Sequence, residues 1–306
     1  MHIVVMGTGG VGGFFGAKLA RAGETVTLVA RGAHLEAIRR DGLSVRSAVE
    51  GDSVVRAPAV EDLTGLAPAD AVLFCVKSFD TERAAAALRP VVLPETAVLS
   101  LQNGVDNEER IDAILGAGHA VGGVAQVFAG IERPGVIAHR FAGRIIFGEL
   151  DGRRSARAER LLAVFEAARV PVELTTGIRR ALWEKYILIC AVGGMTALTR
   201  CPIGVIRDTP ETWAMFRRIV EEVAALGTAA KAGLAADVVD QTVKFATGIA
   251  PASRASLAED LLQGRRLELD ALHGHAVRLG ERLGVPVPTV AAVYAALLPH
   301  AAGGLG

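Results

Sequence analysis

The sequence predicts an α/β protein in which an N-terminal, doubly wound sheet (residues 1–174) is followed by a second, all-helical domain (residues 175–306). Three observations lead to this prediction. Short apolar runs alternate with helical patterns in the first half of the chain, as in an open parallel sheet with helices on both faces. A glycine-rich turn joins the first apolar run to the first helical pattern. Beyond residue 174 the strand patterns stop and only helical periodicity continues.

The glycine turn follows the apolar run His2–Met6 and reads Gly7-Thr8-Gly9-Gly10-Val11-Gly12. Its glycines fit G-x-G-x-x-G, a spacing that allows a tight turn, close backbone approach to a pyrophosphate, and close helix–strand packing. The start of the next helix offers N–H groups to the phosphates. A second apolar run, residues 25–30, follows where a βαβ unit requires one. We therefore expect a Rossmann-type dinucleotide site; the alternative is a turn that serves only packing.

Arg31 closes the second predicted strand and indicates which dinucleotide binds. An acidic residue at this point binds the ribose hydroxyls of NAD, whereas a 2′-phosphate requires a cation. The nearest acid along the sequence is Glu36. The expected cofactor is therefore NADP (NADPH), and the alternative for Arg31 is an ordinary solvated arginine.

Composition excludes several classes of partner. The formal net charge is zero and 51% of residues are hydrophobic, so nothing favours binding to nucleic acid or to an anionic membrane. No apolar run approaches the roughly 20 residues of a membrane span. The three cysteines lack metal-ligand spacing, so no metal is expected. These features predict a cytoplasmic protein with a small-molecule partner; they leave the oligomeric state open, a homodimer included.

Each further element is predicted from periodicity and turn residues. In the first domain, helices are expected at 34–40, 81–88, 107–115 and 155–168, strands at 43–45, 54–55, 71–76, 97–101 and 170–174, and a β-rich part at 121–150 with a turn at Pro134-Gly135. In the second domain, helices are expected at 178–199, 210–232, 236–247, 256–283 and 288–298.

Two polar residues directly follow predicted strands of the sheet. Lys77 comes after the run 71–76, and Asn103 comes after the next strand. Ligands of doubly wound sheets lie outside the carboxyl ends of the strands, which makes both residues candidates. Each has an ordinary alternative, because Asn-Gly is a strong turn former and a lysine at a strand end is commonly solvated.

Lys185 lies at the centre of an apolar helix face. The side chains three and four residues away on either side are all apolar: Ala181, Leu182, Leu188 and Ile189. Such a lysine either extends past its neighbours to solvent or lies in a cleft where desolvation lowers its pKa. A lowered pKa suits a proton donor that works near neutral pH.

The stretch from Ser256 to Asp270 holds a third group of candidates. Ser256 and Glu259 have the spacing of a capping box, and a capped helix start can also receive a carboxylate. Glu268 lies about three helical turns further on, and spacing alone predicts a surface position for it.

Together these pieces resemble the ketopantoate reductases, or 2-dehydropantoate 2-reductases, over nearly the whole chain. The resemblance rests on motifs in their order and spacing: the glycine turn, Val29-Ala30-Arg31-Gly32, Cys75-Val76-Lys77, Gln102-Asn103-Gly104, Trp183-Glu184-Lys185, and Ser256 through Gly274 with Glu268-Leu269-Asp270.

The resemblance implies NADPH-dependent reduction of a 2-oxo acid to a 2-hydroxy acid, which for ketopantoate gives pantoate in pantothenate and coenzyme A biosynthesis. It implies these roles: Lys185 as general acid, Glu268 holding the lysine or the substrate hydroxyl, Ser256 binding the substrate carboxylate end, Asn103 positioning nicotinamide and substrate, and Lys77 and Arg31 contacting the cofactor.

The sequence departs from the family at two positions. The family usually has asparagines four and eight residues after the lysine, whereas this chain has Ile189 and Gly193. Three alternatives to a ketopantoate reductase therefore stay open: a paralogous reductase of a more apolar 2-oxo acid or another carbonyl compound, a non-catalytic NADP(H)-binding protein, and a β-hydroxyacid-type dehydrogenase. Lys185 and Glu268 argue against the second, and the stretch from Ser256 to Asp270 argues against the third.

Overall fold

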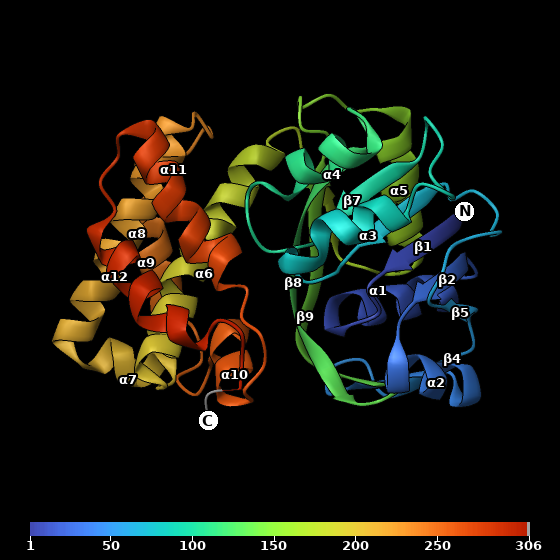
Figure 1. The fold of residues 1–306 in the computed structure, drawn as a ribbon, viewed down its shortest axis with the longest axis horizontal. Coiled ribbons are helices and arrows are strands. Elements are labelled where there is room, and N and C mark those ends of the chain that lie inside the picture. The colour runs from blue at the N-terminus through green and yellow to red at the C-terminus, as the bar shows by residue number, and fades with distance from the viewer. Residues whose placement is uncertain (305–306) are drawn as a thin grey trace. The chain divides into compact units, whose positions relative to one another are not determined.

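The computed structural model describes residues 1–304 (Figure 1). Its internal contacts divide the chain into two compact units. The first, called here the sheet unit, comprises residues 1–102 and 106–178; the second, the helical unit, comprises residues 103–105 and 179–306. The division along the chain thus falls four residues beyond the predicted boundary, and a three-residue segment that includes Asn103 groups with the helices.

The described part of the sheet unit contains one ten-stranded sheet. Its order is β4-β3-β9-β8-β7-β6-β1-β2-β5, and β10 pairs with β9. The strands are β1 (His2–Met6), β2 (Thr25–Val29), β3 (Leu43–Ser47), β4 (Ser53–Val55), β5 (Ala59–Val60), β6 (Ala71–Phe74), β7 (Ala97–Ser100), β8 (Ala120–Arg133), β9 (Val136–Gly148) and β10 (Val172–Leu174).

The parallel part of the sheet has the doubly wound strand order. From β5 through β2, β1, β6 and β7 to β8, all neighbours are parallel, and the order reverses between β1 and β6. Met6 pairs with both Val29 and Phe74, so β1, β2 and β6 end at one edge of the sheet. This register places the turn after β1, the residues after β2 and the residues after β6 along that edge.

The rest of the sheet is antiparallel in part. β8 and β9 form a long hairpin whose turn lies at Pro134-Gly135, as predicted, with Gly135 at φ 78°. The short β3 and β4 also pair antiparallel, and β3 joins the sheet through β9. The sheet is therefore mixed. A tight two-residue turn brings β9 back antiparallel beside β8, whereas a parallel neighbour would need a crossover connection.

Helices cover both faces of the sheet (Figure 1). Ile3 and Val5 pack with α1 (Gly10–Arg21) and α5 (Ala156–Ala167) on one face. Val4 and Met6 pack with α3 (Thr81–Ala87) and α4 (Asn107–Leu115) on the other face. This alternation is why the strands are apolar throughout. The helices of this unit are α1 (Gly10–Arg21), α2 (Gly32–Asp41), the 3₁₀ segment η1 (Ser78–Asp80), α3 (Thr81–Ala87), α4 (Asn107–Leu115) and α5 (Ala156–Ala167).

The helical unit contains α6 (Ile178–Thr199), α7 (Ile203–Asp208), α8 (Pro210–Ala229), α9 (Val238–Thr247), α10 (Ser256–Leu262), the π-helical segment η2 (Asp270–Gly274), α11 (His275–Leu283), α12 (Pro288–Leu297) and the 3₁₀ segment η3 (Leu298–His300). Sequence reasoning missed α7. It also predicted one helix over 256–283, which is wrong: Gly264 adopts φ 62° and the chain leaves helical geometry before η2.

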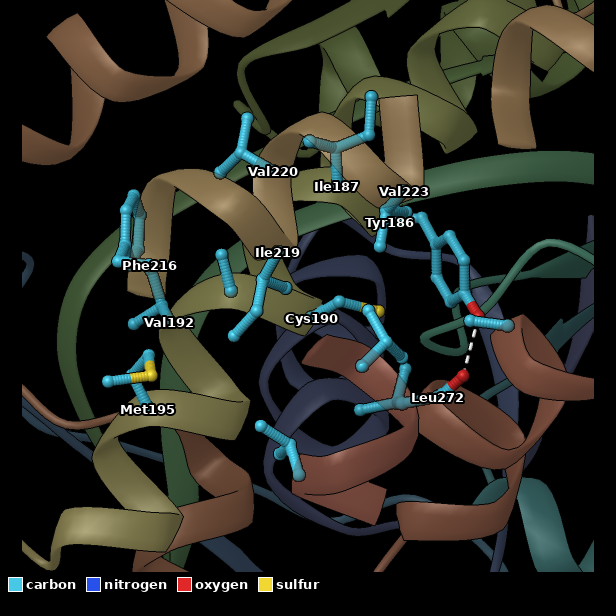
Figure 2. Packing of buried hydrophobic residues seen from close by; sticks show 14 of the residues in the cluster. Tyr186, Ile187, Cys190, Val192, Met195, Phe216, Ile219, Val220, Val223 and Leu272 are labelled. Atoms are coloured by element: carbon cyan, nitrogen blue, oxygen red, sulfur yellow. Dashed lines mark hydrogen bonds between the residues drawn. The ribbon is translucent and has the colours of Figure 1, made fainter. Parts of the chain in front are cut away.

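Helix α6 forms the centre of the helical unit's core (Figure 2). Tyr186, Ile187 and Cys190 are fully buried, and they pack with Phe216 and Ile219 of α8. By length and mean hydropathy α6 would suffice to cross a membrane, contrary to the expectation from the sequence. However, 61% of its most apolar window is buried inside the protein, which identifies it as a core helix.

Candidate active site

The three glycines of the motif occupy three different environments. Gly7 adopts φ 101°, and a Cβ there would lie 2.9 Å from the backbone nitrogen of Val76. A Cβ on Gly12 would lie 2.2 Å from the carbonyl oxygen of Gly7. A Cβ on Gly9 would meet nothing within 4 Å. The first and last glycines thus allow the tight turn and the helix–strand contact, while the middle one faces open space that a pyrophosphate can approach.

The other residues of the turn fix it in place. A Cβ on Gly10 would lie 2.1 Å from the carbonyl oxygen of Ala129, so this glycine permits β8 to cross the start of α1. Thr8 is buried, and both its N–H and its hydroxyl donate to the carbonyl oxygen of Val29, at 3.0 and 2.9 Å. Val11 is partly buried against the core of the sheet unit. Thr8 therefore ties the turn to the end of β2, immediately before Arg31.

Arg31 extends from the end of β2 into solvent, with 61% of its side chain exposed. Its Nη2 lies 2.6 Å from Oδ2 of Asp80, the last residue of η1. Glu36 is the nearest acid along the sequence, but Asp80 is nearer in space, because β1 alone separates the strands that precede Arg31 and Asp80. The end of β2 thus carries both a cation and an acid.

Lys77 and Asn103 follow β6 and β7 as expected. Lys77 is exposed at the start of η1, and Asn103 is half-buried before Gly104, whose φ is 121°. Between them, the buried Gln102 donates from Nε2 to the carbonyl oxygen of Val76 (3.0 Å) and to Oγ1 of Thr81 (2.9 Å). Gln102, which sequence reasoning did not single out, therefore holds the backbone just before Lys77.

In the helical unit, Lys185 of α6 is partly buried, beside apolar residues that belong to the core. Burial lowers the pKa of its ammonium from 10.5 to about 8, and the negative charge of Glu268 acts in the opposite direction. Glu268 is 7% exposed, so the surface position that helical spacing alone predicted for it is wrong. The loop after α10 breaks the helical spacing and brings the carboxylate into electrostatic range of the lysine.

Two hydrogen bonds attach the segment after Glu268 to α6. The hydroxyl of Tyr186 donates to the carbonyl oxygen of Leu272 at 2.5 Å (Figure 2). Nε2 of the buried His273 lies 2.9 Å from the carbonyl oxygen of Cys190. Burial lowers the pKa of His273 to about 4, so the ring is neutral at pH 7 and Nε2 donates to that carbonyl. These bonds fix the π-helical segment, and thereby Glu268, against the helix that carries Lys185.

The capping box predicted for Ser256 and Glu259 is not formed. Ala255 is the N-cap residue, with extended backbone (φ −75°, ψ 160°), and it accepts from the N–H of Glu259. Ser256 is already helical and exposed, and no side-chain cap is present at this helix start. Because N-cap side chains act from non-helical backbone, Ser256 is placed one residue too late to cap.

The two departures from the family pattern lie on apolar parts of α6. Ile189 packs at the edge of the helical core. A Cβ on Gly193 would meet side-chain atoms of Leu257 and Ala255 at 3.7 to 3.9 Å, which is ordinary contact.

Two residues before Ser256, the buried Nε of Arg254 makes no hydrogen bond within the described residues. Sequence reasoning passed over Arg254, although an arginine in an otherwise small and apolar stretch was a visible signal.

Within residues 1–304, no group of three or more histidine, cysteine, aspartate or glutamate side chains is arranged to hold a metal ion. Among the groups described above, the ammonium of Lys185 in the helical unit has a lowered pKa that suits proton transfer near neutral pH.

Comparison with known proteins agrees with both units. Residues 3–152 match the family model described as ketopantoate reductase PanE/ApbA, and residues 177–301 match the model of its C-terminal part. The 2-dehydropantoate 2-reductase of Halobacterium salinarum is 30% identical over 95% of each chain. A crystal structure of a PanE/ApbA family ketopantoate reductase from Ralstonia eutropha has a TM-score of 0.91 and 36% identity, covering 98% of both chains.

The fold also matches that of a D-mandelate dehydrogenase bound to NADH and anilino(oxo)acetate, with a TM-score of 0.91. At 20% identity, over 98% of both chains, this likeness concerns the fold alone. The family models together cover most of the chain, and the full-length relatives share its order of domains. The chain belongs to the ketopantoate reductase PanE/ApbA family of oxidoreductases.

Proposed function

We propose that this protein uses NADPH to reduce a 2-oxo acid to a 2-hydroxy acid, with 2-dehydropantoate as the first substrate to test. The observation that supports the proposal most is the ammonium of Lys185, whose pKa burial lowers to about 8. At pH 7 this group is mostly protonated, yet it gives up its proton far more readily than a solvated lysine. Family membership gives the reaction class in which such a donor is needed.

Lys185 donates a proton from Nζ to the carbonyl oxygen of the substrate, and its charge stabilises the alkoxide that develops there. Bound NADPH supplies the hydride, so one hydride and one proton convert the oxo group to a hydroxyl group. Glu268 supports the protonated lysine electrostatically, as its effect on the lysine pKa indicates, or holds the hydroxyl of the substrate.

The sheet edge suits a dinucleotide. Gly9 leaves room for a pyrophosphate, and Gly7 and Gly12 shape the turn around it. Residues Gly7 to Gly12 would hold the phosphates, and Arg31 and Lys77 would contact the adenosine end and the phosphates as cations. Asn103 would position nicotinamide and substrate, and the exposed hydroxyl of Ser256 would bind the carboxylate end of the substrate.

A second candidate is a more apolar 2-oxo acid, or another carbonyl compound. Ile189 and Gly193 favour it, because neither can hydrogen-bond a substrate hydroxyl, and Gly193 faces the apolar side chains of Leu257 and Ala255. Sites that hydrogen-bond a substrate group reject analogues lacking it by factors on the order of 10⁴. Losing such partners therefore changes which acid is preferred without changing the reaction.

The test measures NADPH oxidation with 2-dehydropantoate and with 2-oxo acids bearing aliphatic or aromatic side chains. We expect turnover with at least one acid, and its loss in Lys185→Ala while NADPH still binds. Higher kcat/KM for an apolar acid than for 2-dehydropantoate would select the second candidate. NADPH binding without turnover of any acid would contradict the proposed reaction and favour a non-catalytic NADP(H)-binding protein.

The cofactor is tested separately by Arg31→Ala. We expect this variant to lose most of its preference for NADPH over NADH, because the guanidinium assigned to the 2′-phosphate would be removed. An unchanged preference would contradict the assignment of NADPH through Arg31.

A further inference from the structure

Asp80 lies in contact with the arginine that we assign to the 2′-phosphate. Its Oδ2 accepts from Nη2 of Arg31 at 2.6 Å, and its Oδ1 accepts from Nη2 of Arg83 at 2.8 Å. The carboxylate-bearing side chain is 15% exposed, while the two arginine side chains are 61% and 66% exposed. One sheltered carboxylate thus joins two guanidinium groups that both extend into solvent.

The fold explains why these residues meet. Arg31 follows β2, and Asp80 ends η1 after β6; both strands pair with β1 in a register that ends them at the same edge. In doubly wound sheets the adenosine ribose binds at the end of the second strand, where an acid accepts hydrogen bonds from its hydroxyls and a cation meets a 2′-phosphate. This site contains both groups, one from each side of β1.

The charges make the two groups compete. A 2′-phosphate that binds Arg31 must share the guanidinium with Asp80 or displace it, and the carboxylate repels the phosphate. A 2′-hydroxyl meets no such repulsion, and a carboxylate can accept its hydrogen bond. Arg83 binds the other oxygen of the same carboxylate, so Asp80 is shared between the two arginines.

We infer that Asp80 is a specificity-determining residue, which competes with the 2′-phosphate for Arg31 and accepts the ribose hydroxyls of NADH. The protein therefore uses NADH as well as NADPH, and Asp80 sets the ratio between them. The inference rests on the proposed dinucleotide site. It adds that the preference for NADPH over NADH depends on both Arg31 and Asp80, and not on Arg31 alone.

The test uses the full-length protein and two fragments of the cofactors, adenosine 2′,5′-bisphosphate and 5′-AMP, whose binding is measured by calorimetry at fixed ionic strength. In Asp80→Asn we expect the affinity for the bisphosphate, relative to 5′-AMP, to rise about fivefold, since exposed ion pairs of this kind contribute up to about 1 kcal/mol. The ratio of kcat/KM for NADPH to that for NADH should rise by a similar factor.

Glu36→Gln is the matched control. It removes one carboxylate charge from α2, close to Arg31 in sequence, but its exposed side chain pairs with Arg39 at 3.3 Å instead of with Arg31. The fragment ratio should stay unchanged in this variant.

An unchanged fragment ratio in Asp80→Asn would overturn the inference. A lower relative affinity for the bisphosphate would also overturn it, because Asp80 would then orient Arg31 toward the phosphate. These outcomes differ from a failure of the proposed cofactor, which would appear as an unchanged ratio in Arg31→Ala.

Discussion

The glycine turn of the sheet unit and the lysine–glutamate pair of the helical unit are built in opposite ways. The turn consists of six consecutive residues whose shape is set by backbone conformation, and its contacts to Val76 and Ala129 are steric. The pair joins two side chains 83 positions apart in the sequence, Lys185 and Glu268. Its chemistry depends on burial and on charge, which the packing of the helical unit supplies.

The two places also differ in how the requirements of stability and of the proposed function relate to each other. At Gly7 and Gly12 a Cβ would clash with the backbone, so the fold itself requires glycine there. In the proposed site the same glycines shape the turn that holds the phosphates, so stability and binding make the same demand. In the proposed reaction Lys185 would favour function at the expense of stability, because its burial disfavours the charged form that a proton donor must have. Mutations should therefore affect stability in opposite directions at the two sites.

The largest expected effect is at Lys185. Lys185→Met should lower kcat by a factor on the order of 10² to 10⁴, the usual contribution of a general acid. The same change should raise the free energy of unfolding at pH 7 by about 1–3 kcal/mol, since it removes a buried charge whose pKa is depressed. Activity assays and urea denaturation measure the two effects.

Lys244→Met is the control for Lys185→Met, because Lys244 is an exposed lysine on α9 of the same unit. It should change neither kcat nor stability appreciably. A large loss of stability in Lys185→Met would contradict the view that this lysine is kept for chemistry.

Two glycine substitutions test the turn. Gly12→Ala should destabilise the sheet unit by about 3 kcal/mol or more, because the added Cβ meets a carbonyl oxygen at 2.2 Å. Gly9→Ala should fold normally, since its Cβ meets nothing within 4 Å, but it should weaken NADPH binding about tenfold or more by blocking the approach of the pyrophosphate. Thermal denaturation and titration with NADPH would separate the effects; equal loss of stability in both variants would show that Gly9 serves packing.

The pH dependence of turnover tests the lysine directly. The pKa of Lys185 is lowered to about 8, so the donor is protonated below this pH and loses its proton above it. We expect kcat/KM to be level near pH 7 and to fall about tenfold per unit well above pH 8. A profile that stays level to pH 10 would exclude a lysine with this pKa as the donor.

The smallest expected effect is at Tyr186. Tyr186→Phe removes the hydrogen bond that ties Leu272, and hence the segment after Glu268, to α6. It should cost about 1–2 kcal/mol of stability and lower kcat a fewfold. Because Glu268 raises the pKa of Lys185, a displaced glutamate should also move the alkaline fall in activity to lower pH.

Tyr294→Phe is the matched change for Tyr186→Phe. Its hydroxyl donates to the exposed carboxylate of Asp270 at 3.1 Å, so removing it should leave the pH profile in place. A profile equally unmoved in Tyr186→Phe would show that Tyr186 has only a structural role.

Much of the fold could be predicted because local patterns determine it. The bounds of α4 and α6 agree with the predicted 107–115 and 178–199, where apolar periodicity extends without interruption. The prediction failed over 256–283, because helical periodicity continues through a stretch in which Gly264 adopts a left-handed conformation and the chain turns. Similarly, an apolar run cannot show whether β8 pairs parallel or antiparallel with its neighbours.

The sequence by itself determined the doubly wound strand order around a glycine turn, the helical second unit, and the lysine on an apolar helix face. These follow from short-range spacing, which chain geometry converts directly into strands, turns and helix faces. Only the tertiary structure decided that Asp80 pairs with Arg31, that Glu268 is buried within range of Lys185, and that Ser256 does not cap its helix. Each of these depends on where loops place residues distant in sequence, or on a one-residue shift in backbone conformation, and neither is encoded in local periodicity.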